Sequence, residues 1–452
     1  MQKGFLFDLN KCTGCNACQI ACSIENEIPL PLNWRQVISF NDQRHPKLPV
    51  FNLSLACSHC LDAPCLKFCP ALAISKDEVT GAVLIDEKSC IGCRYCSWVC
   101  PYDAPVYNTI KGTMEKCTFC IHRLEENLEP ACVTLCPTSA LQMSDHPADY
   151  LHKHIPGVTT VDIKPAVQFV PLREDHQLPD TYDIPFDDSI VQLYRSSFEK
   201  KKVREKISWI HELPLILFSL LAALSFGSYT GSILNTPITG NYLQFIAGLS
   251  AMAFSTFHLG KKFRAPRAFL NFSNSWLSRE MTFFALFIFT MSLQILFYAE
   301  AKWLAWIAIL TGFLSLYALD KVYSVVALVS KLQYHSATAV LTGMFLASFF
   351  ADFSFGIIIF GGIKFLLYLK QKISQWKNLT VISIVLGSIR IGSGFIIPLI
   401  FWFIQIQDVW TISITLILIA EFIDRCEFYE GLEIITPEKQ MQDDLKSFVS
   451  RV

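Results

Sequence analysis

The sequence lacks an excess of charge of either sign. Its 38 Lys and Arg residues nearly balance its 39 Asp and Glu residues, and the formal net charge is −1. This balance gives no reason to expect a nucleic-acid partner, because phosphate backbones attract strongly basic surfaces. The chain also has neither a nucleophile constellation nor a cofactor loop, so we expect any substrate-reducing centre to lie in another protein. Its first residues, "MQKGFLFDLNKC", contain no apolar run and no twin arginine, and we expect no cleavable signal peptide.

Cysteine is almost absent from most of the chain and is concentrated near its start. Only Cys426 lies outside the segment from Cys12 to Cys136, which holds the other sixteen of the seventeen cysteines. Those sixteen form four runs of four, which are Cys12, Cys15, Cys18 and Cys22, then Cys57, Cys60, Cys65 and Cys69, then Cys90, Cys93, Cys96 and Cys100, and last Cys117, Cys120, Cys132 and Cys136.

The spacing within these runs is typical of bacterial ferredoxins. In "CIGCRYCSWVCP", from Cys90 to Pro101, the cysteines are separated by two, two and three residues. Three such thiolates bind one iron–sulfur cubane, and the fourth binds a neighbouring cluster. Disulfides and tetrahedral zinc are the alternatives, and complete runs of four favour neither. The sequence therefore predicts four [4Fe–4S] clusters in interlocked pairs.

An internal repeat indicates how this part of the chain folds. "FDLNKCTGCNACQIAC" and "IDEKSCIGCRYCSWVC" are similar, and each predicts a strand, a cluster loop and a short helix. Apolar residues are few in this region, so we expect the clusters to serve as its core. We predict an α+β ferredoxin-like domain over residues 1–145, in which His59 donates to or packs beside a cluster and is not itself a ligand.

Residues 1 to about 175 resemble the four-cluster iron–sulfur subunit of the DMSO reductase group of molybdopterin enzymes. The resemblance implies that the first run pairs with the fourth and the second with the third. It implies four ligand sets, which are Cys12, Cys15, Cys18 and Cys136; Cys22, Cys117, Cys120 and Cys132; Cys57, Cys60, Cys65 and Cys100; and Cys69, Cys90, Cys93 and Cys96. It places the first set beside a catalytic subunit and the last beside the membrane, and it makes Lys76 a candidate quinone contact.

Long apolar runs dominate from about Ile210 to Ile423. A run of about 20 apolar residues is long enough to cross a bilayer. We predict an all-α polytopic membrane domain over residues 209–428, preceded by a connector at 146–208 and followed by a polar tail at 429–452. About eight spans are expected, at residues 211–229, 242–259, 280–298, 301–318, 336–352, 354–370, 384–405 and 409–426.

The loop charges indicate an orientation for these spans. Fourteen Lys and Arg residues fall in the loops on one side, whereas the other side has only Lys302. The positive-inside rule then places the ferredoxin domain on the cytoplasmic side of a bacterial inner membrane. This differs from the best-known relatives, whose iron–sulfur subunit is exported with a twin-arginine partner. The cytoplasm also suits sixteen reduced thiols awaiting clusters.

Three motifs resemble the membrane-anchor subunit of DMSO reductase. They are "HELPL" from His211, "FHLGKKFRAPRAFLNFSNSWLSRE" from Phe257, and "AEFIDRCEFYEGL" near the end. That anchor is an eight-helix protein that oxidises menaquinol and carries no haem. The resemblance implies that this chain fuses an iron–sulfur subunit to an anchor. We also expect no haem on physical grounds, because the three histidines of this half lie at expected helix ends and not within facing helices.

Titratable groups in the apolar half collect on the side of the ferredoxin domain, where quinol oxidation needs bases. His258 is the first candidate to bind a quinol hydroxyl and take its proton, because imidazole titrates near neutral pH. Glu421 and Arg425 form either an ion pair or a site of proton release, and Arg390 is a headgroup contact or an anchor. Weaker candidates for quinone contacts, or for interfacial residues, are His211, Arg279 and His335.

The sequence as a whole favours an electron-transfer function. Menaquinol or another quinol gives electrons to the clusters, and a separate molybdopterin-containing catalytic subunit receives them. One alternative is the reverse direction, in which a dehydrogenase partner reduces quinone through the same clusters. Another is a non-catalytic membrane anchor with a redox-sensing head. In each case the expected partners are membrane lipid, quinol or quinone, and a second protein, with no nucleic acid.

Overall fold

The computed structural model divides the 452-residue chain into two compact units. One, the cysteine-rich unit, comprises Met1–Glu205 and Ile434–Val452, and the other, the helical unit, comprises Lys206–Glu433. The structure describes residues 2–42, 48–145, 155–158, 163–173, 207–235, 242–297, 300–326, 335–374, 380–404, 410–432, 434 and 436–451. Most of the expected connector, 146–208, therefore lies outside the described residues.

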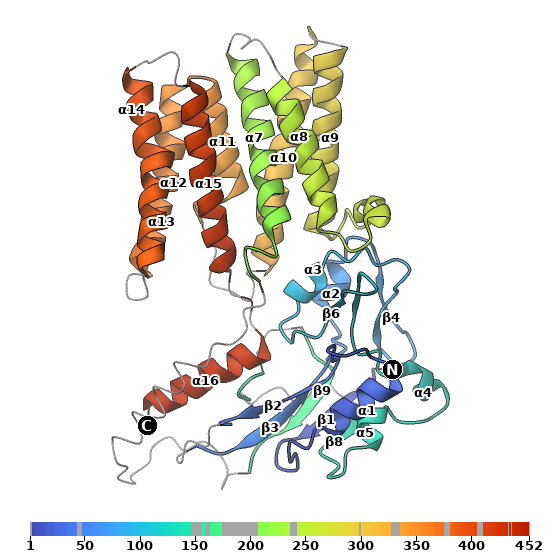
Figure 1. Ribbon diagram of the computed structural model, residues 1–452. Helices are drawn as coiled ribbons and strands as arrows, with labels where there is room; N and C mark the ends of the chain where they lie inside the picture. Colours follow the sequence, from blue (N-terminus) through green and yellow to red (C-terminus); the bar gives the residue numbers. More distant parts are fainter. Residues whose placement is uncertain are drawn as a thin grey trace. The chain divides into compact units, whose positions relative to one another are not determined.

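A three-stranded sheet forms one part of the cysteine-rich unit (Figure 1). Its central strand β1 (Gly4–Asp8) pairs antiparallel with β8 (Leu141–Ser144) and parallel with β9 (Val167–Val170). The alternation in "GFLFD" turns Phe5 and Phe7 into the interior, where both are buried. This pairing brings segments from three distant parts of the sequence together around the first and last cysteine runs.

Three two-stranded hairpins complete the strands of this unit. They are β2 (Gln36–Phe40) with β3 (Phe51–Leu55), β4 (Ile74–Lys76) with β5 (Val83–Ile85), and β6 (Val106–Asn108) with β7 (Thr113–Glu115). The helices are short, which leaves most cysteines on loops, and they are α1 (Ala17–Glu25), α2 (Pro64–Lys67), α3 (Tyr95–Trp98), α4 (Ile121–Glu125) and α5 (Ala131–Thr134).

The two repeated cysteine motifs adopt the same order of elements. In each, a strand leads into a cysteine loop and then into a helix, first as β1 and α1 and then as β5 and α3. Asn16 and Arg94, just before these helices, both have left-handed backbone conformations, with φ of 60° and 61°. Such a residue turns the chain sharply between the cysteine loop and the helix.

The expected polar tail folds back as a helix of the cysteine-rich unit. Helix α16 (Pro437–Arg451) buries Met441 and Leu445, and Asp444 accepts a hydrogen bond of 3.0 Å from the Gly157 backbone N–H. Gly157 has a φ of +83° and lies against Met441, so a side chain there would meet both strain and a clash. The chain therefore leaves the cysteine-rich unit, forms the helical unit and returns.

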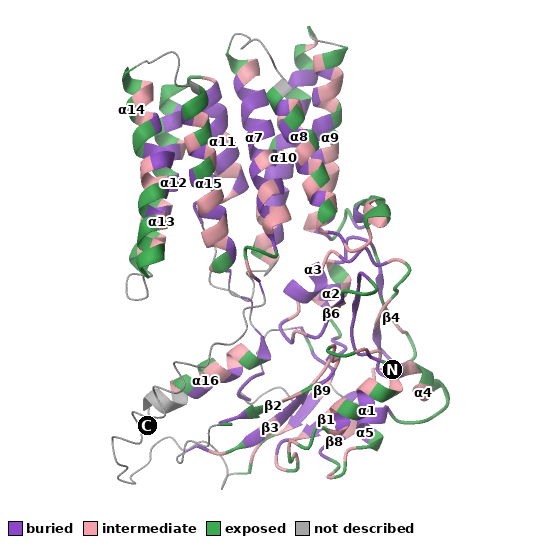
Figure 2. Ribbon diagram, in the orientation of Figure 1, coloured by how far each residue is buried: buried purple, intermediate pink, exposed green. Residues whose placement is uncertain are grey.

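The helical unit is built from long apolar helices (Figure 1). They are α7 (Leu213–Leu234), α8 (Tyr242–Phe257), the 3₁₀ helix η2 (Lys262–Phe269), α9 (Trp276–Leu296), α10 (Lys302–Val326), α11 (Ala339–Phe350), α12 (Ser354–Ser374), α13 (Val381–Ile391), the π-helix η4 (Gly392–Ile396), α14 (Ile397–Ile404) and α15 (Trp410–Glu430). Figure 2 shows much of α7 as buried. The core around α7 includes Phe226, Phe287 and Leu346.

The number of candidate membrane spans differs from the eight expected. Among the described residues, five helical segments are long and apolar enough to cross, namely α7, α9, α10, α12 and Val381–Ile404. A sixth arises if α8 and η2, which are bent by 105°, form one span. The fifth expected span contains only the 12-residue α11, which is short for a crossing. The eighth coincides with α15, whose Glu421, Asp424, Arg425 and Glu427 interrupt its apolar character.

Candidate metal centres and membrane site

The sixteen cysteines of the four runs lie near one another, and we group them in the four sets of four that the resemblance implies. Within each group the thiolates are close enough to interact electrostatically, although the members come from different runs. Group 1 is Cys12, Cys15, Cys18 and Cys136, group 2 is Cys22, Cys117, Cys120 and Cys132, group 3 is Cys57, Cys60, Cys65 and Cys100, and group 4 is Cys69, Cys90, Cys93 and Cys96. These groups follow the ligand sets that the resemblance implies, and the assignment of each set to one cluster stays a prediction.

Burial makes these thiolates costly unless a cation is near. Burial raises the pKa of Cys22 to about 12, Arg35 opposes the rise, and Cys132 and Cys120 add to it. Burial likewise raises the pKa of Cys93 to about 12, with a further contribution from Cys69. Iron ligation requires thiolates and supplies the positive charge that offsets this cost. No disulfide forms among the seventeen cysteines, all of which the structure describes.

The surroundings of the cysteines fit iron–sulfur clusters. Backbone N–H groups point at cysteine sulfurs, from Ala73 to Cys69 at 3.4 Å and from Met114 to Cys90 at 3.5 Å. Such bonds are typical of cluster loops, where they stabilise thiolate ligands. The guanidinium of Arg35 is buried beside group 2, and its Nε and Nη2 have no hydrogen-bond partner among the described residues. A buried cation of this kind fits an anionic neighbour.

His59 lies within group 3 without the geometry of a further ligand. Its Nδ1 accepts a hydrogen bond of 3.0 Å from the Val83 N–H, which places the ring proton on Nε2. Burial, followed by the charges of Lys116 and Arg35, lowers the pKa of His59 well below its usual value. The ring packs at 4.9 Å from the Phe119 ring. His59 is therefore a neutral, packed side chain.

Lys76, the candidate quinone contact of this unit, ends strand β4. Its amine donates to the carbonyl oxygens of Cys60 and Leu61, both at 3.4 Å. These bonds tie the β4–β5 hairpin to the loop that carries Cys60. The described contacts therefore give Lys76 a local structural role beside group 3.

A network of buried charges occupies the helical unit. Glu421 on α15 lies 3.0 Å from the amine of Lys364 on α12 and 3.2 Å from the guanidinium of Arg425, and it also accepts from Thr342 at 2.8 Å. One turn along α15, Asp424 lies 2.5 Å from Arg390 of α13. Buried charges need such partners, because an unpaired ion in an apolar interior is strongly unfavourable.

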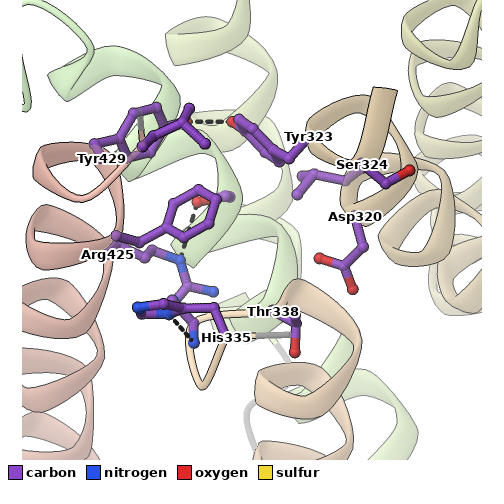
Figure 3. Close-up of a pocket in the computed structure, with 12 residues that line it drawn as sticks. Asp320, Tyr323, Ser324, His335, Thr338, Arg425 and Tyr429 are labelled. Atoms are coloured by element: carbon purple, nitrogen blue, oxygen red, sulfur yellow. Dashed lines mark hydrogen bonds between the residues drawn. The ribbon is translucent and has the colours of Figure 1, made fainter. Parts of the chain in front are cut away.

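A small cavity with both apolar and polar side chains in its wall, which we call the polar cavity for its titratable groups, opens beside this network (Figure 3). It has a volume of about 60 Å³, and its lining includes Asp320, Tyr323, His335, Arg425 and Tyr429. The Nε of Arg425 donates to Ser219 at 3.0 Å, and the hydroxyls of the two tyrosines are hydrogen-bonded to each other. A cavity of this size holds ordered water but is small for a quinone ring. Side chains must move before a headgroup can enter.

Asp320 and His335 hold the start of α11 next to this cavity. Asp320 accepts hydrogen bonds from the backbone N–H groups of Ala339 at 2.7 Å and Val340 at 3.1 Å, and so caps the helix. The Nδ1 of His335 accepts from the Ala337 N–H at 3.0 Å and lies 4.0 Å from Asp424. The cavity is thus connected to the charge network through both His335 and Arg425.

The structure brings together some of the expected membrane-site residues and not others. Glu421, Arg425 and Arg390 belong to the charge network, and Arg425 and His335 line the polar cavity. The other three expected residues, His258, His211 and Arg279, do not line it. Arg279 donates to the Phe272 and Ser273 carbonyl oxygens and stacks on Trp276, so that it holds the loop before α9. His258 follows the end of α8, and His211 is an exposed residue before α7.

Sequence reasoning missed Lys364 in this network. It is the one charged residue within the apolar stretch "SFGIIIFGGIKFLLYL", and its side chain is fully buried in the protein. An isolated charge inside an otherwise apolar span was the available signal, since such residues are rare and usually paired. Its partners on α11 and α15 could not be read from the sequence.

A second, larger cavity in the helical unit is apolar. It has a volume of about 360 Å³ and lies between α11, α12 and the segment from η4 to α14. Gly362 and Gly394 form part of its wall, and a side chain added at Gly362 would meet nothing within 4 Å. Its lining suits an apolar ligand and offers no partner for a polar headgroup.

Sixteen cysteines in ferredoxin spacing, most of them buried and on loops, define the cysteine-rich unit as an iron–sulfur electron-transfer domain. Residues 49–146 match the family model described as "4Fe-4S dicluster domain". The cysteine groups bind [4Fe–4S] clusters, each of which, when bound, exchanges one electron at a time.

This protein belongs to the family of iron–sulfur subunits that includes the one of anaerobic dimethyl sulfoxide reductase. It is 38% identical to that subunit from Escherichia coli (strain K12) over 176 residues, which is 37% of this chain and 84% of the relative. The corresponding subunit of tetrathionate reductase from Salmonella typhimurium is 37% identical over 194 residues, covering 41% of this chain and 73% of the relative.

A third relative widens the range of enzymes to which the subunit family contributes. The arsenate respiratory reductase iron–sulfur subunit of Shewanella sp. (strain ANA-3) is 31% identical over 193 residues, covering 32% of this chain and 82% of the relative. Each of the three matches spans less than half of this chain. They concern the N-terminal part, and the apolar helices that follow indicate an attached membrane part.

Proposed function

We propose that this chain oxidises a membrane quinol and passes the electrons through four [4Fe–4S] clusters to a separate catalytic subunit. The observation that carries the proposal is the presence, in one chain, of four four-cysteine groups and a helical unit with a buried charge network beside a polar cavity. In this proposal groups 1 to 4 each ligate one cluster, and electrons move from group 4 towards group 1.

The polar cavity is the proposed quinol site. Oxidation of a quinol to a quinone breaks two O–H bonds and releases two protons and two electrons, so the site needs bases and an electron acceptor. Asp320 and His335 line the cavity and are the nearest bases, and Arg425 offers a cation to a hydroxyl or carbonyl oxygen. Glu421 and Arg390 adjoin it through their ion pairs with Arg425 and Asp424. His258 is the competing candidate from the sequence.

The proposed partner is a molybdopterin-containing oxidoreductase. The relatives are named as parts of reductases for dimethyl sulfoxide, tetrathionate and arsenate, which differ in substrate. An electron-transfer subunit shared among such enzymes implies that the substrate is reduced elsewhere. For this chain the partner would dock near group 1, and affinity purification of the tagged chain with mass spectrometry of the co-purifying large subunit tests that assignment.

The return of the chain to the cysteine-rich unit limits the number of membrane crossings that the helical unit can make. Because residues before Lys206 and after Glu433 belong to the same unit, the helical unit must cross the bilayer an even number of times. Five candidate spans are odd in number, so at least one further segment crosses, and the bent pair of α8 and η2 is a candidate. We place the cysteine-rich unit on the cytoplasmic side of a bacterial inner membrane, as the basic loops favour.

Rapid-mixing reduction of the purified chain with a menaquinol analogue tests the site. With His335→Ala we expect cluster reduction to slow at least tenfold while iron and sulfide content stay unchanged, because a base that lines the cavity is lost. His258→Ala is the matched comparison, and on this assignment it reduces at close to the parental rate. If cluster reduction slowed in His258→Ala and not in His335→Ala, the quinol site would lie at His258. Parental rates in both variants would show that neither histidine takes part in quinol oxidation.

A further inference from the structure

Arg35 is a buried cation without a carboxylate partner. Its side chain is 2% exposed, and no carboxylate lies within 4.0 Å among the described residues. Its Nη1 donates to the carbonyl oxygen of Ser54 at 3.3 Å and to the Ser54 hydroxyl at 3.0 Å, and its guanidinium lies 4.8 Å from the centre of the Phe5 ring. Two of its three nitrogens have no partner in the described part of the chain.

The neighbours of Arg35 that carry charge are cysteines of groups 1 and 2. Burial alone would lower the pKa of Arg35, but the thiolates of Cys132 and Cys117, together with those of Cys18 and Cys22, outweigh burial and raise it. The Ser54 hydroxyl that Arg35 binds lies 3.2 Å from the sulfur of Cys18. The guanidinium therefore lies between group 1 and group 2, with three of the four neighbouring cysteines in group 2.

Lys116 occupies a corresponding place between groups 2 and 3. It is 3% exposed, and its amine donates to the carbonyl oxygens of Val83 and, at 3.3 Å, Cys117. The cysteines that lie near its charge are Cys57 and Cys65 of group 3 and Cys117 of group 2. Like Arg35, it has no carboxylate within 4.0 Å among the residues that the structure describes.

A buried cation beside a cluster changes the free energy of adding an electron. Each cluster with four thiolate ligands is anionic, and reduction adds one more negative charge. In a medium of low dielectric constant a fixed positive charge stabilises the reduced form more than the oxidised form, which raises the reduction potential. The cation in turn is stabilised by the anion that it faces, which explains why no carboxylate is needed.

We propose that Arg35 and Lys116 raise the reduction potential of the cluster held by group 2, the only group of described cysteines that both cations adjoin. This inference rests on the proposed occupancy of the four groups and deepens it, because it assigns an electrostatic function to two residues that are not ligands. Group 2 is next to group 1 in the proposed order towards the catalytic subunit. A raised potential there makes it an electron store within the series of clusters.

Exposed lysines of the same unit provide matched controls. Lys11 is 49% exposed and lies 3.7 Å from Asp8, close to Cys12 in sequence. Lys111 is 47% exposed and is paired with Glu87 and Glu115. Solvent and the paired carboxylates screen both charges, so their removal changes the potential of a buried cluster little.

Electron paramagnetic resonance of the purified full-length chain at poised potentials measures the effect. In Arg35→Gln and in Lys116→Gln we expect the oxidised-to-reduced ratio of the group 2 cluster, at fixed potential, to rise at least tenfold, which is 59 mV for a one-electron couple. The group 1 cluster shifts as well in the first variant, and the group 3 cluster shifts as well in the second. The shifts add in the double variant. Cys120→Ser identifies the signal of group 2, and Lys11→Gln and Lys111→Gln leave all potentials within error of the parent.

The inference is overturned if the group 2 signal titrates as in the parent in both variants while iron and sulfide content are unchanged. It is also overturned if the group 4 signal shifts as much as that of group 2. Arg35→Lys keeps the charge and retains most of the parental potential, which separates charge from packing. If Arg35→Gln fails to assemble clusters, Lys116→Gln decides. Dithionite suffices to reduce the clusters, so failure of quinol oxidation leaves this test intact.

Discussion

Lys364 and Glu421 are charged residues inside an apolar helical unit, and each is paired with a group of opposite charge. Both side chains are almost completely buried, and Glu421 neutralises two cations, because Lys364 and Arg425 bind the same carboxylate oxygen. Thr342 satisfies Glu421 further and also accepts from the amine of Lys364. The carboxylate thus joins α11, α12 and α15. The spacing of Glu421 and Arg425 predicts their intrahelical pair, but it does not predict Lys364, because a spacing along one helix says nothing about a second helix.

Replacement of Glu421 should therefore be costly. In Glu421→Gln the charge that faces Lys364 and Arg425 is lost, and two buried cations remain without an anion between them. Removal of one partner of a buried pair typically destabilises a protein by about 3–5 kcal/mol. We expect a clearly lower midpoint of thermal unfolding in detergent, followed by circular dichroism. Lys302→Gln, at an exposed position, is the control, and a parental midpoint for Glu421→Gln would contradict the assigned role of the network.

At the scale of elements, the contact between α7 and α11 depends on small residues. Gly227 faces Leu346 and Gly231 faces Phe350, in each case so closely that a side-chain carbon would clash with the opposite helix. A pair of glycines four residues apart lets two helices approach until their backbones nearly touch. This packing places α7 against the second half of α11, within the core of the helical unit.

Gly227→Ala should separate these two helices. The added carbon would meet the Cβ of Leu346, which cannot move away without the backbone, and overpacking of this kind costs about 1–3 kcal/mol. We expect a lower thermal midpoint in detergent. Gly362→Ala on α12 is the matched control, because its added carbon meets nothing and alanine favours a helix over glycine by about 1 kcal/mol. Equal destabilisation by both substitutions would refute the close packing.

The sequence was most informative where covalent chemistry constrains it. The cysteine spacing predicts [4Fe–4S] clusters in interlocked pairs, because ligands of one cluster must converge whatever the chain does between them. The assignment of the sixteen cysteines to four ligand sets comes from the resemblance and stays a prediction. Hydropathy located the apolar helices, but it did not predict the bent pair of α8 and η2 or the π-helix Gly392–Ile396 between α13 and α14. Such bends depend on contacts with other helices, as at Gly394, whose position against Ala420 leaves no room for a side chain.

At the scale of the whole molecule, the return of α16 to the cysteine-rich unit constrains the topology. The composition of the last residues predicts a polar tail, because it lacks a long apolar run. Only the fold shows that Met441 and Leu445 form one buried face of a helix and that Asp444 binds Gly157. Both ends of the helical unit thereby join the cysteine-rich unit, which favours an even number of crossings independently of loop charge.

The same constraint predicts which loops face the same side of the membrane as the cysteine-rich unit. In the proposed topology α7 (Leu213–Leu234) starts on the side of the cysteine-rich unit, so Asn235 after its other end faces away, and the segment after α8 returns. In intact cells, we expect Ser273→Cys to react with an impermeant thiol reagent only after the membrane is opened, and Asn235→Cys to react at once. Cys426→Ser removes the unliganded native thiol from the background. If both cysteines reacted from the same side of the membrane, α8 would not cross back after α7, and the proposed topology would be wrong.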